Sequence, residues 1–336
     1  MADYRAYDFT AFRPGGGSAG TAAHGRSCPV RAHSERQPLN HIEVISAGLL
    51  TTVQDLGRPG YAHLGISASG AADALSLRAG NLLVGNAEGA AALEMTLAGG
   101  RFQFESAAVV ALTGADFEAS IPLWTAVEVK AGEHVRCGHA RSGARGYLCV
   151  RGGIRVAPVL GSASTHLLTG LGGLEGRALR RGDVLAIGDA AVRSGWGKLR
   201  GSPPWTAGPI RVTAAASAQA LCAAVWQVKE DSDRMGLRLR GPELGSRTGH
   251  LPTEGVPLGA IQVPPDGQPI ILFVEHQTTG GYAKIANVIS ADFHSVGQLR
   301  PRDEARFEQV SMDTALRLLR AQEDWLRGLY VVQSGT

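Results

Sequence analysis

The stretch "GAIQVPPDGQPIILFV", residues 259–274, contains two apolar runs joined by Pro-Pro-Asp-Gly. Proline presets the backbone angle of a turn and glycine accepts positive angles, so this tetrapeptide predicts a tight turn. The branched residues on either side of it favour strands. The stretch therefore predicts a β-hairpin, with Gln262 on its first strand.

The same pattern continues along most of the chain after His41, where short apolar runs are interrupted by Gly, Pro, Asn and Asp. Helical patterns are fewer. They cover residues 71–85, where Ser69 is suited to be the N-cap, and residues 311–330, opened by Ser311. We expect a mainly β protein with a few packed helices. The candidate strands are residues 42–46, 101–105, 108–114, 133–138, 146–152, 183–188, 209–214, 269–274 and 304–310.

A Gly-, Ser- and Pro-containing segment, residues 193–208, separates two groups of strand-like runs and is the best candidate for a linker. It predicts two β-rich lobes, residues 39–195 and residues 208–320, the second followed by a C-terminal helix to about residue 330. Residues 1–38 are polar and rich in Gly, Ser and Ala. They predict a disordered tail, or a start codon placed too early.

Two segments resemble each other. "LRRGDVLAIG", residues 179–188, ends the first lobe, and "LRPRDEARFE", residues 299–308, ends the second. Each predicts a turn that leads into a final strand. The match indicates that the two lobes could be related by duplication.

Composition excludes several classes of protein. The chain has 336 residues, of which 44% are hydrophobic and 19% are charged, and no apolar run approaches the ~20 residues that span a bilayer. A net charge of +3 is too small for a nucleic-acid-binding field. We expect a cytoplasmic protein that binds neither membrane nor nucleic acid. Its scattered cysteines and histidines lack metal-binding spacing, so we expect no metal.

The loop "TTVQDLGRPGYAHLGISASGAAD", residues 51–73, is dense in glycine and in polar side chains. For Gln54, Asp55 and Arg58 we favour a structural role, with Asp55 and Arg58 as a local pair that holds the loop, over a ligand-facing one. Ser69, Gly70 and Asp73 lie at the start of the predicted helix, where free backbone N–H groups favour an anion. We consider two roles for these three residues, a ligand-facing one and a purely structural one.

The segment "DSDRMGLRLRGP", residues 231–242, places Arg234 immediately before a strand. A planar guanidinium matches the geometry of a carboxylate, so Arg234 is a candidate to bind a substrate carboxylate. The alternative is a structural arginine that pairs with Asp231 or Asp233.

Amides and hydroxyls gather in "VEHQTTGGYAK", residues 274–284. Gln277 follows the strand that the tight turn connects to Gln262, so the two amides are expected to meet on one face of the hairpin. Thr278 and Thr279 are expected to help hold an amide substrate.

The next residues extend this candidate site. Gly280 and Gly281 would let backbone N–H groups approach a ligand oxygen. The Tyr282 hydroxyl would orient or protonate the ligand. The alternative is a glycine bulge that carries a buried tyrosine.

Several exact motifs in a fixed order connect the chain to a known family. Between about residues 43 and 310, the chain resembles the KipA family, the C subunit of bacterial 5-oxoprolinase, which is homologous to a segment of urea carboxylase and is often labelled a biotin-dependent carboxyltransferase. Ala72, Ala283 and His276 depart from the family pattern, where Met, Pro and Arg are usual. The replacement of the usual Arg by His276 affects the expected identity of the substrate more than the expected fold. The matching motifs are "TTVQDLGRPGY", "SGAAD", "NLLVGN", "VRGGI", "PVLGSAST", "SDRMGLRLRGP", "EGVPLGAIQVPPDGQPI", "QTTGGY" and "VISADF".

The resemblance implies a cyclophilin-like β-barrel in the second lobe and an activity that belongs to a complex, with the chain inactive alone. The implied partners are a KipI-like protein, which is the B subunit of 5-oxoprolinase, and the A subunit of the same enzyme. The implied reaction is ATP-dependent opening of the lactam 5-oxoproline to glutamate. The chain lacks a GxxxxGK[ST] phosphate loop, so ATP is expected at the level of the complex.

Two alternatives follow from the same resemblance. One is the carboxyltransferase component of a biotin-dependent urea or amide carboxylase, with carboxybiotin as the donor. The other is a KipA-type regulatory binding protein. In both enzyme interpretations the acceptor is a planar amide, for which Arg234, Gln277 and Tyr282 are the expected catalytic residues. The expected substrate-binding residues are Ser69, Gly70, Asp73, Gln262, Thr278, Thr279, Gly280 and Gly281.

Overall fold

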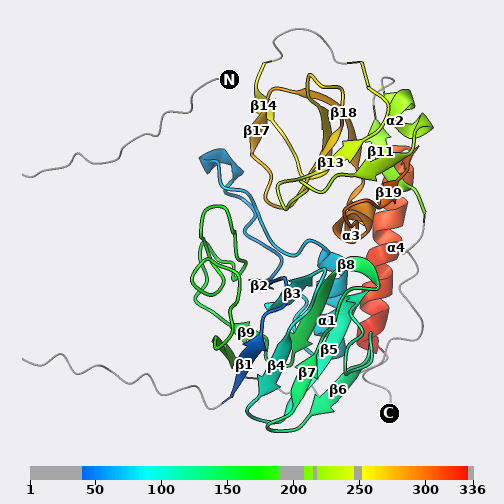
Figure 1. The fold of residues 1–336 in the computed structure, drawn as a ribbon. Coiled ribbons are helices and arrows are strands. Elements are labelled where there is room, and N and C mark those ends of the chain that lie inside the picture. The colour runs from blue at the N-terminus through cyan, green and yellow to red at the C-terminus, as the bar shows by residue number, and fades with distance from the viewer. Residues whose placement is uncertain (1–39, 190–207, 215–217, 246–251, 332–336) are drawn as a thin grey trace, which may run out of the picture. The chain divides into compact units, whose positions relative to one another are not determined.

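The structure, a computed structural model, describes residues 40–189, 208–214, 218–245 and 252–331. Strands dominate it (Figure 1), which confirms the mainly β prediction. The predicted tail lies outside the described residues, as does the predicted linker apart from Gly208.

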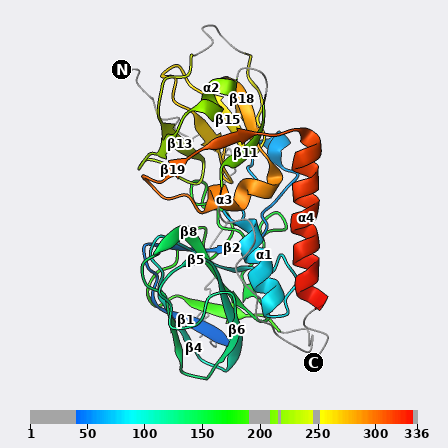
Figure 2. The same ribbon diagram turned by 90° about the vertical axis from the view of Figure 1, so that its right-hand side faces the viewer.

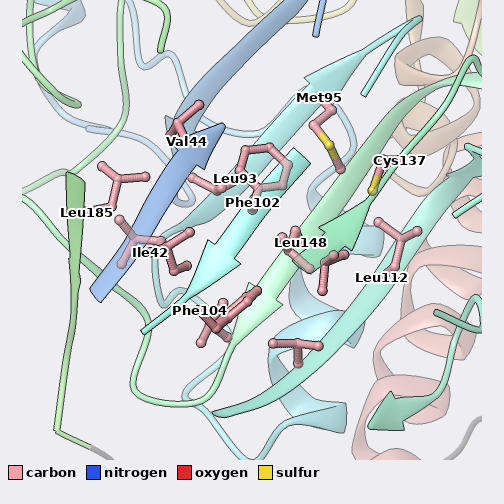
Figure 3. Packing of buried hydrophobic residues seen from close by; sticks show 14 of the residues in the cluster. Ile42, Val44, Leu93, Met95, Phe102, Phe104, Leu112, Cys137, Leu148 and Leu185 are labelled. Atoms are coloured by element: carbon pink, nitrogen blue, oxygen red, sulfur yellow. The ribbon is translucent and has the colours of Figure 1, made fainter. Parts of the chain in front are cut away.

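The strands from His41 to Ile187 form two five-stranded antiparallel sheets, here called the N-terminal β region. Side chains from both sheets share one buried cluster, in which Phe102 and Leu148 are central (Figure 3). The first sheet has the order β7 (His134–Arg136), β4 (Arg101–Phe104), β1 (His41–Ser46), β10 (Val184–Ile187) and β9 (Ile154–Arg155). The second has the order β2 (Leu50–Gln54), β3 (Ala92–Thr96), β8 (Ser142–Val150), β5 (Ala108–Asp116) and β6 (Ala126–Val129).

The strands from Ile210 to Gln309 form an eight-stranded sheet, here called the C-terminal β region. Its two edge strands are consecutive in the chain, with only Arg306 between them, so the sheet nearly closes into a barrel. The single strand expected at 304–310 is therefore two short strands. The order is β19 (Glu304–Ala305), β12 (Trp226–Val228), β13 (Gly236–Arg240), β16 (Ile270–Leu272), β15 (Ala260–Val263), β18 (Ala283–Val288), β11 (Ile210–Ala214) and β20 (Phe307–Gln309).

The predicted hairpin lies inside this sheet. β15 and β16 pair antiparallel, with Ile261 opposite Ile271. The N–H of Gly267 donates to the carbonyl of Pro264 at 3.0 Å, and Gly267 has a positive φ of 71°. The Pro-Pro-Asp-Gly turn is confirmed.

Helix α1 (Ala74–Leu83) packs on the second N-terminal sheet through a cluster that includes Leu77. Its N-cap is Asp73, whose side chain accepts the Ser76 N–H at 2.9 Å. The prediction that Ser69 is the N-cap is wrong. Its N–H donates to the carbonyl of Val274, and its φ of 55° places it in a turn before the helix.

The C-terminal helix α4 (Met312–Val331) begins after Ser311, whose hydroxyl accepts the Thr314 N–H at 3.2 Å, as expected. Figure 2 shows α4 alongside α1. Leu326 packs with Leu75, and the Arg78 guanidinium bonds both carboxylate oxygens of Glu323 at 2.6 and 2.7 Å. The end of the chain is thus fixed to the N-terminal β region. The remaining helices are α2 (Gln219–Ala223), α3 (Phe293–Gly297) and the 3₁₀ turns at Ala62–Leu64 and Ser290–Asp292.

The two similar segments adopt the same turn. The Arg180 N–H donates to Asp183 Oδ2 at 2.7 Å, and the Arg300 N–H donates to Asp303 Oδ2 at 2.9 Å. The carbonyls of the two aspartates then accept N–H groups from β1 and β12, at 2.9 and 3.0 Å. The expected turns are confirmed, and their common geometry supports an internal duplication.

No helix in the described part of the chain is long and apolar enough to cross a membrane.

Candidate functional site

Arg234 connects the two β regions through a buried cluster that we call the Arg234 junction (Arg234, Glu94, Glu275, Ser69 and Gly70). Arg234 is 8% exposed. It donates from Nη1 to Glu94 Oε1 at 2.5 Å, from Nε to Glu275 Oε1 at 2.5 Å, and from Nη2 to the Gly70 carbonyl at 2.6 Å. Glu94 lies on β3 of the N-terminal β region, and Glu275 follows β16 of the C-terminal β region. The Arg234 side chain therefore joins the two β regions.

The electrostatics of Arg234 are those of a paired cation. Burial lowers its pKa, but the carboxylates of Glu94 and Glu275 more than offset this and hold the pKa above its ordinary value. Asp231 and Asp233 do not pair with it in the described structure, so the partners considered from the sequence are wrong. A substrate carboxylate would have to displace one of the present partners.

The start of α1 does not offer the free N–H groups that the sequence predicted. The Ala72 N–H donates to Glu94 Oε2 at 2.8 Å, and the Asp73 N–H donates to the Tyr147 hydroxyl at 2.7 Å. That hydroxyl donates to Glu94 Oε2 at 2.8 Å, and burial raises the pKa of Tyr147, so it stays protonated. The expected anion-binding position is therefore filled by Glu94 of the chain itself.

The three site residues predicted at the start of α1, which are Ser69, Gly70 and Asp73, make different contacts. Ser69 Oγ lies 3.1 Å from the Thr165 carbonyl and 3.4 Å from Glu275 Oε1, within the Arg234 junction. Asp73 caps α1 and also accepts from Gln298 Nε2 at 2.7 Å. The structure thus brings Ser69 and Gly70 to Arg234, and it places Asp73 beside them on the helix.

The two predicted glutamines do meet. Gln262, on β15, is 1% exposed, and its Oε1 accepts from Gln277 Nε2 at 3.4 Å. Its Nε2 lies 3.5 Å from the Tyr282 carbonyl. These distances are long for hydrogen bonds, and Gln277 is exposed, so both amides keep capacity for another partner.

Residues 278–281 run over Gln262. Thr279 and Gly280 form β17, which pairs with β14 (Glu254–Gly255), and the Thr278 carbonyl accepts from the Val256 N–H. A Cβ built on Gly280 would lie 2.7 Å from Gln262 Nε2, so a larger residue at this position would have to displace the Gln262 amide. Gly281 is exposed. We call Gln262, Gln277 and residues 278–281 the amide cluster.

Tyr282 follows directly and is 49% exposed, so the alternative of a buried tyrosine is wrong. It lines a cavity of about 430 Å³ together with apolar side chains and Lys284, whose Nζ lies 3.1 Å from Glu254 Oε1. Among the described residues, Gln277 does not line this cavity. The candidate site predicted in residues 274–284 is thus divided into the amide cluster and a cavity that Tyr282 lines.

A serine–histidine pair lies near the junction and was not singled out from the sequence. Ser67 Oγ lies 2.8 Å from His166 Nε2. His166 Nδ1 accepts the Thr169 N–H at 3.2 Å, so the neutral ring carries its proton on Nε2 and donates it to Ser67. Burial lowers the pKa of His166, which favours this neutral form. In this tautomer His166 donates to Ser67 and does not accept its proton.

The sequence reasoning also missed the two acids that hold Arg234. Glu94 stands alone in the apolar strand "ALEMT", and Glu275 stands alone at the end of "ILFVE". A single acid within a strongly apolar run predicts a buried, paired carboxylate, because an unpaired one would be too costly. That signal was available in the sequence.

No group of three His, Cys, Asp or Glu side chains in the described residues is arranged to hold a metal ion.

Comparisons with known proteins agree with this architecture. Residues 64–309 match the family described as carboxyltransferase domain, subdomain A and B. The chain is 41% identical to the C subunit of 5-oxoprolinase from Escherichia coli (strain K12) over 305 residues, which cover 86% of this chain and 97% of that protein. It is 39% identical to the C subunit of 5-oxoprolinase from Haemophilus influenzae over 300 residues, covering 85% and 96% of the two chains.

A solved structure shows a similar fold. The Kluyveromyces lactis urea amidolyase aligns with a TM-score of 0.79 and 30% sequence identity, over 88% of this chain and 20% of that one. The resemblance expected from the sequence motifs is confirmed, and the chain belongs to the carboxyltransferase domain, subdomain A and B, family, together with the 5-oxoprolinase C subunits.

Proposed function

We propose that this chain is the C subunit of an ATP-dependent 5-oxoprolinase complex, which opens the lactam 5-oxoproline to glutamate. The observation that carries the proposal is the 41% identity to the C subunit of an Escherichia coli 5-oxoprolinase over 97% of that protein's length. Similarity that spans nearly the whole relative, rather than one segment of it, supports a common role in the complex.

The chemistry of the amide cluster suits this substrate. Opening a lactam develops negative charge on its carbonyl oxygen, and preorganised neutral donors stabilise that charge. Gln277 is exposed and only loosely bonded to Gln262 at 3.4 Å, so its amide can turn to a ligand. The hydroxyls of Thr278 and Thr279 and the N–H of the exposed Gly281 provide further donors in the same short segment, whereas Gly280 is paired with Glu254 in the β14–β17 ladder.

Tyr282 follows this cluster directly in the chain. Its side chain is half exposed, beside a cavity that Lys284 and apolar side chains line. We assign Tyr282 the protonation of the ligand. Arg234 is assigned a positioning role, because its guanidinium already holds Glu94 and Glu275.

The chain lacks a GxxxxGK[ST] phosphate loop, so ATP is expected to bind in the complex that it forms with the A subunit of 5-oxoprolinase and a KipI-like B subunit. The chain alone is expected to be inactive.

The test is to co-express the chain with its neighbouring subunits and to measure ATP-dependent release of glutamate from 5-oxoproline. The complex should release glutamate, and Tyr282→Phe should lower kcat by about 100-fold or more, the usual range for a general acid. Arg327→Ala, an exposed change on α4, serves as the matched control. An assembled complex without glutamate release would overturn the proposal.

A second function is favoured by one specific observation, the match to a carboxyltransferase family and to a urea amidolyase structure. In that case the chain would take part in carboxyl transfer from carboxybiotin to urea or another amide. The ureido ring of biotin presents the same N–H and C=O groups as a lactam, and the Gln262–Gln277 pair fits them. Bicarbonate-dependent carboxylation of urea with an added biotin carboxylase, without glutamate release from 5-oxoproline, would select this function.

A further inference from the structure

The two carboxylates that hold Arg234 are not equivalent. Glu94 uses both oxygens, since Oε1 bonds Arg234 and Oε2 accepts from the Ala72 N–H and the Tyr147 hydroxyl. Glu275 uses one. Its Oε1 accepts from Arg234 Nε at 2.5 Å and lies 3.4 Å from Ser69 Oγ. Its Oε2 has no hydrogen bond within the described residues.

Oε2 of Glu275 also differs from the polar atoms that are simply buried. It is not among the described side-chain nitrogen and oxygen atoms that are wholly buried without a partner. The side chain as a whole is 3% exposed. Glu275 Oε2 is therefore a nearly buried carboxylate oxygen that has no hydrogen-bond partner among the described residues, next to the ion pair that Oε1 makes with Arg234.

The backbone that carries Glu275 is held by hydrogen bonds on both sides of the residue pair 274–275. The Glu275 N–H donates to the Arg234 carbonyl at 2.8 Å, and the Ser69 N–H donates to the carbonyl of Val274 at 2.9 Å. Glu275 lies two residues before Gln277, at the start of the segment that carries the amide cluster. An acceptor held this firmly costs little ordering when a ligand binds.

We propose that Glu275 Oε2 accepts the ring N–H of the bound lactam, and that Arg234 acts as a positioning residue that aims it. This inference rests on the proposed function and adds a determinant of specificity to it. A carboxylate oxygen only accepts hydrogen bonds, so it favours a ligand with an N–H over an analogue with a ring oxygen at that place. Such an analogue would face an unpaired carboxylate, a mismatch that binding sites reject strongly.

The experiment uses the assembled complex and two probes, 5-oxoproline and the lactone in which oxygen replaces the ring N–H. The KM for the lactam is compared with the inhibition constant of the lactone. The wild-type complex should favour the lactam by about 10- to 100-fold, the range for a hydrogen bond to a charged group. Glu275→Gln should raise the KM for the lactam and reduce this preference to about threefold or less, because an N–H₂ replaces the accepting oxygen.

Glu94→Gln is the matched control, since it weakens the same ion pair but leaves Glu275 Oε2 in place. It should lower stability and keep the preference for the lactam. Glu275→Asp covers the case in which Glu275→Gln does not fold. It should raise the KM for the lactam while keeping the preference, because a carboxylate remains at a greater distance.

The outcomes separate the two proposals. A wild-type complex that releases no glutamate overturns the proposed function, and this inference with it. A complex that turns over 5-oxoproline but does not distinguish lactam from lactone overturns the inference alone. So does a folded Glu275→Gln complex with the wild-type preference.

Discussion

The Arg234 junction and the amide cluster meet in one segment, residues 274–281, yet they are built in opposite ways. At the junction, buried charges make contacts of 2.5 to 2.6 Å and Arg234 is fully engaged. In the amide cluster, neutral groups make contacts of 3.4 to 3.5 Å, and Gln277 is exposed. The first region is held by its own partners, whereas the second has hydrogen-bonding capacity left for a ligand.

The difference shows why residue type alone is a poor guide to a site. Arginine is the side chain best suited to a substrate carboxylate, but a buried arginine needs acidic partners simply to be stable. The chain supplies these partners from β3 in the N-terminal β region and from the turn after β16 in the C-terminal β region. The weaker donors next to the junction are the ones that a ligand can use without breaking the fold.

The largest expected effect breaks the junction. Arg234→Ala leaves Glu94 and Glu275 as buried, unpaired carboxylates, which should cost about 3–5 kcal/mol of the free energy of unfolding. Urea denaturation measures the change. Arg327→Ala removes an exposed arginine that pairs with Asp324 and should cost about 0.5 kcal/mol or less. Equal stability of the two variants would contradict the structural role of Arg234.

The second prediction concerns the amide cluster, where a substitution should lower activity and leave stability almost unchanged. Gln277→Ala should leave the free energy of unfolding within about 0.5 kcal/mol, because the residue is exposed. It should lower kcat/KM for the lactam in the complex about tenfold, as expected for one hydrogen bond of about 1.4 kcal/mol. A stable variant with unchanged kcat/KM would exclude Gln277 from substrate binding.

A smaller effect is expected from a substitution at Gly280, also in the amide cluster. Gly280→Ala should displace the Gln262 amide, since the new Cβ would lie 2.7 Å from its Nε2. The amide is the end of a flexible side chain, so the loss of stability should stay below about 1 kcal/mol, while the KM for the lactam rises. Gly255→Ala on the paired strand, where a Cβ meets no atom within 4 Å, is the control. The same KM in both variants would argue against the role of Gln262.

The smallest expected effect is a pH dependence near the junction. Burial lowers the pKa of His166 in the folded state, so the unfolded chain binds a proton first as the pH falls. The contribution of His166 to stability is therefore fully present above about pH 6.5, the ordinary value, and is lost as the pH falls through the lower folded pKa. Thermal unfolding between pH 5 and 8 should show a flatter profile for His166→Gln than for the wild type. Parallel profiles would contradict the neutral, buried histidine.

The fold was largely predictable because its signals are local. The turn at Pro264–Gly267, the strands before and after it, and the Ser311 cap of α4 each depend on a few adjacent residues. The errors have a physical reason as well. Residues 304–310 read as one strand, but closing the barrel requires the chain to bend at Arg306 and pair with both edges of the sheet. Ser69 has the chemistry of an N-cap, yet its backbone is used elsewhere.

The site was predictable only in part. The contact between Gln262 and Gln277 follows from a hairpin, so the spacing alone indicated it. The contact between Arg234 and Glu94 joins residues 140 positions apart, and local patterns cannot show such a pair. Only the isolated acids in apolar runs, Glu94 and Glu275, indicated that a buried cation would be needed.

The most direct test of the proposed site is a crystal structure of the assembled complex with 5-oxoproline bound. The predicted result is a lactam beside residues 275–282, with its ring N–H within hydrogen-bond distance of Glu275 Oε2 and the Arg234 ion pairs intact. A lactam bound elsewhere, such as the cavity of about 320 Å³ lined by Ser295 and Gln298, or one whose carboxylate displaces Glu275 from Arg234, would contradict it.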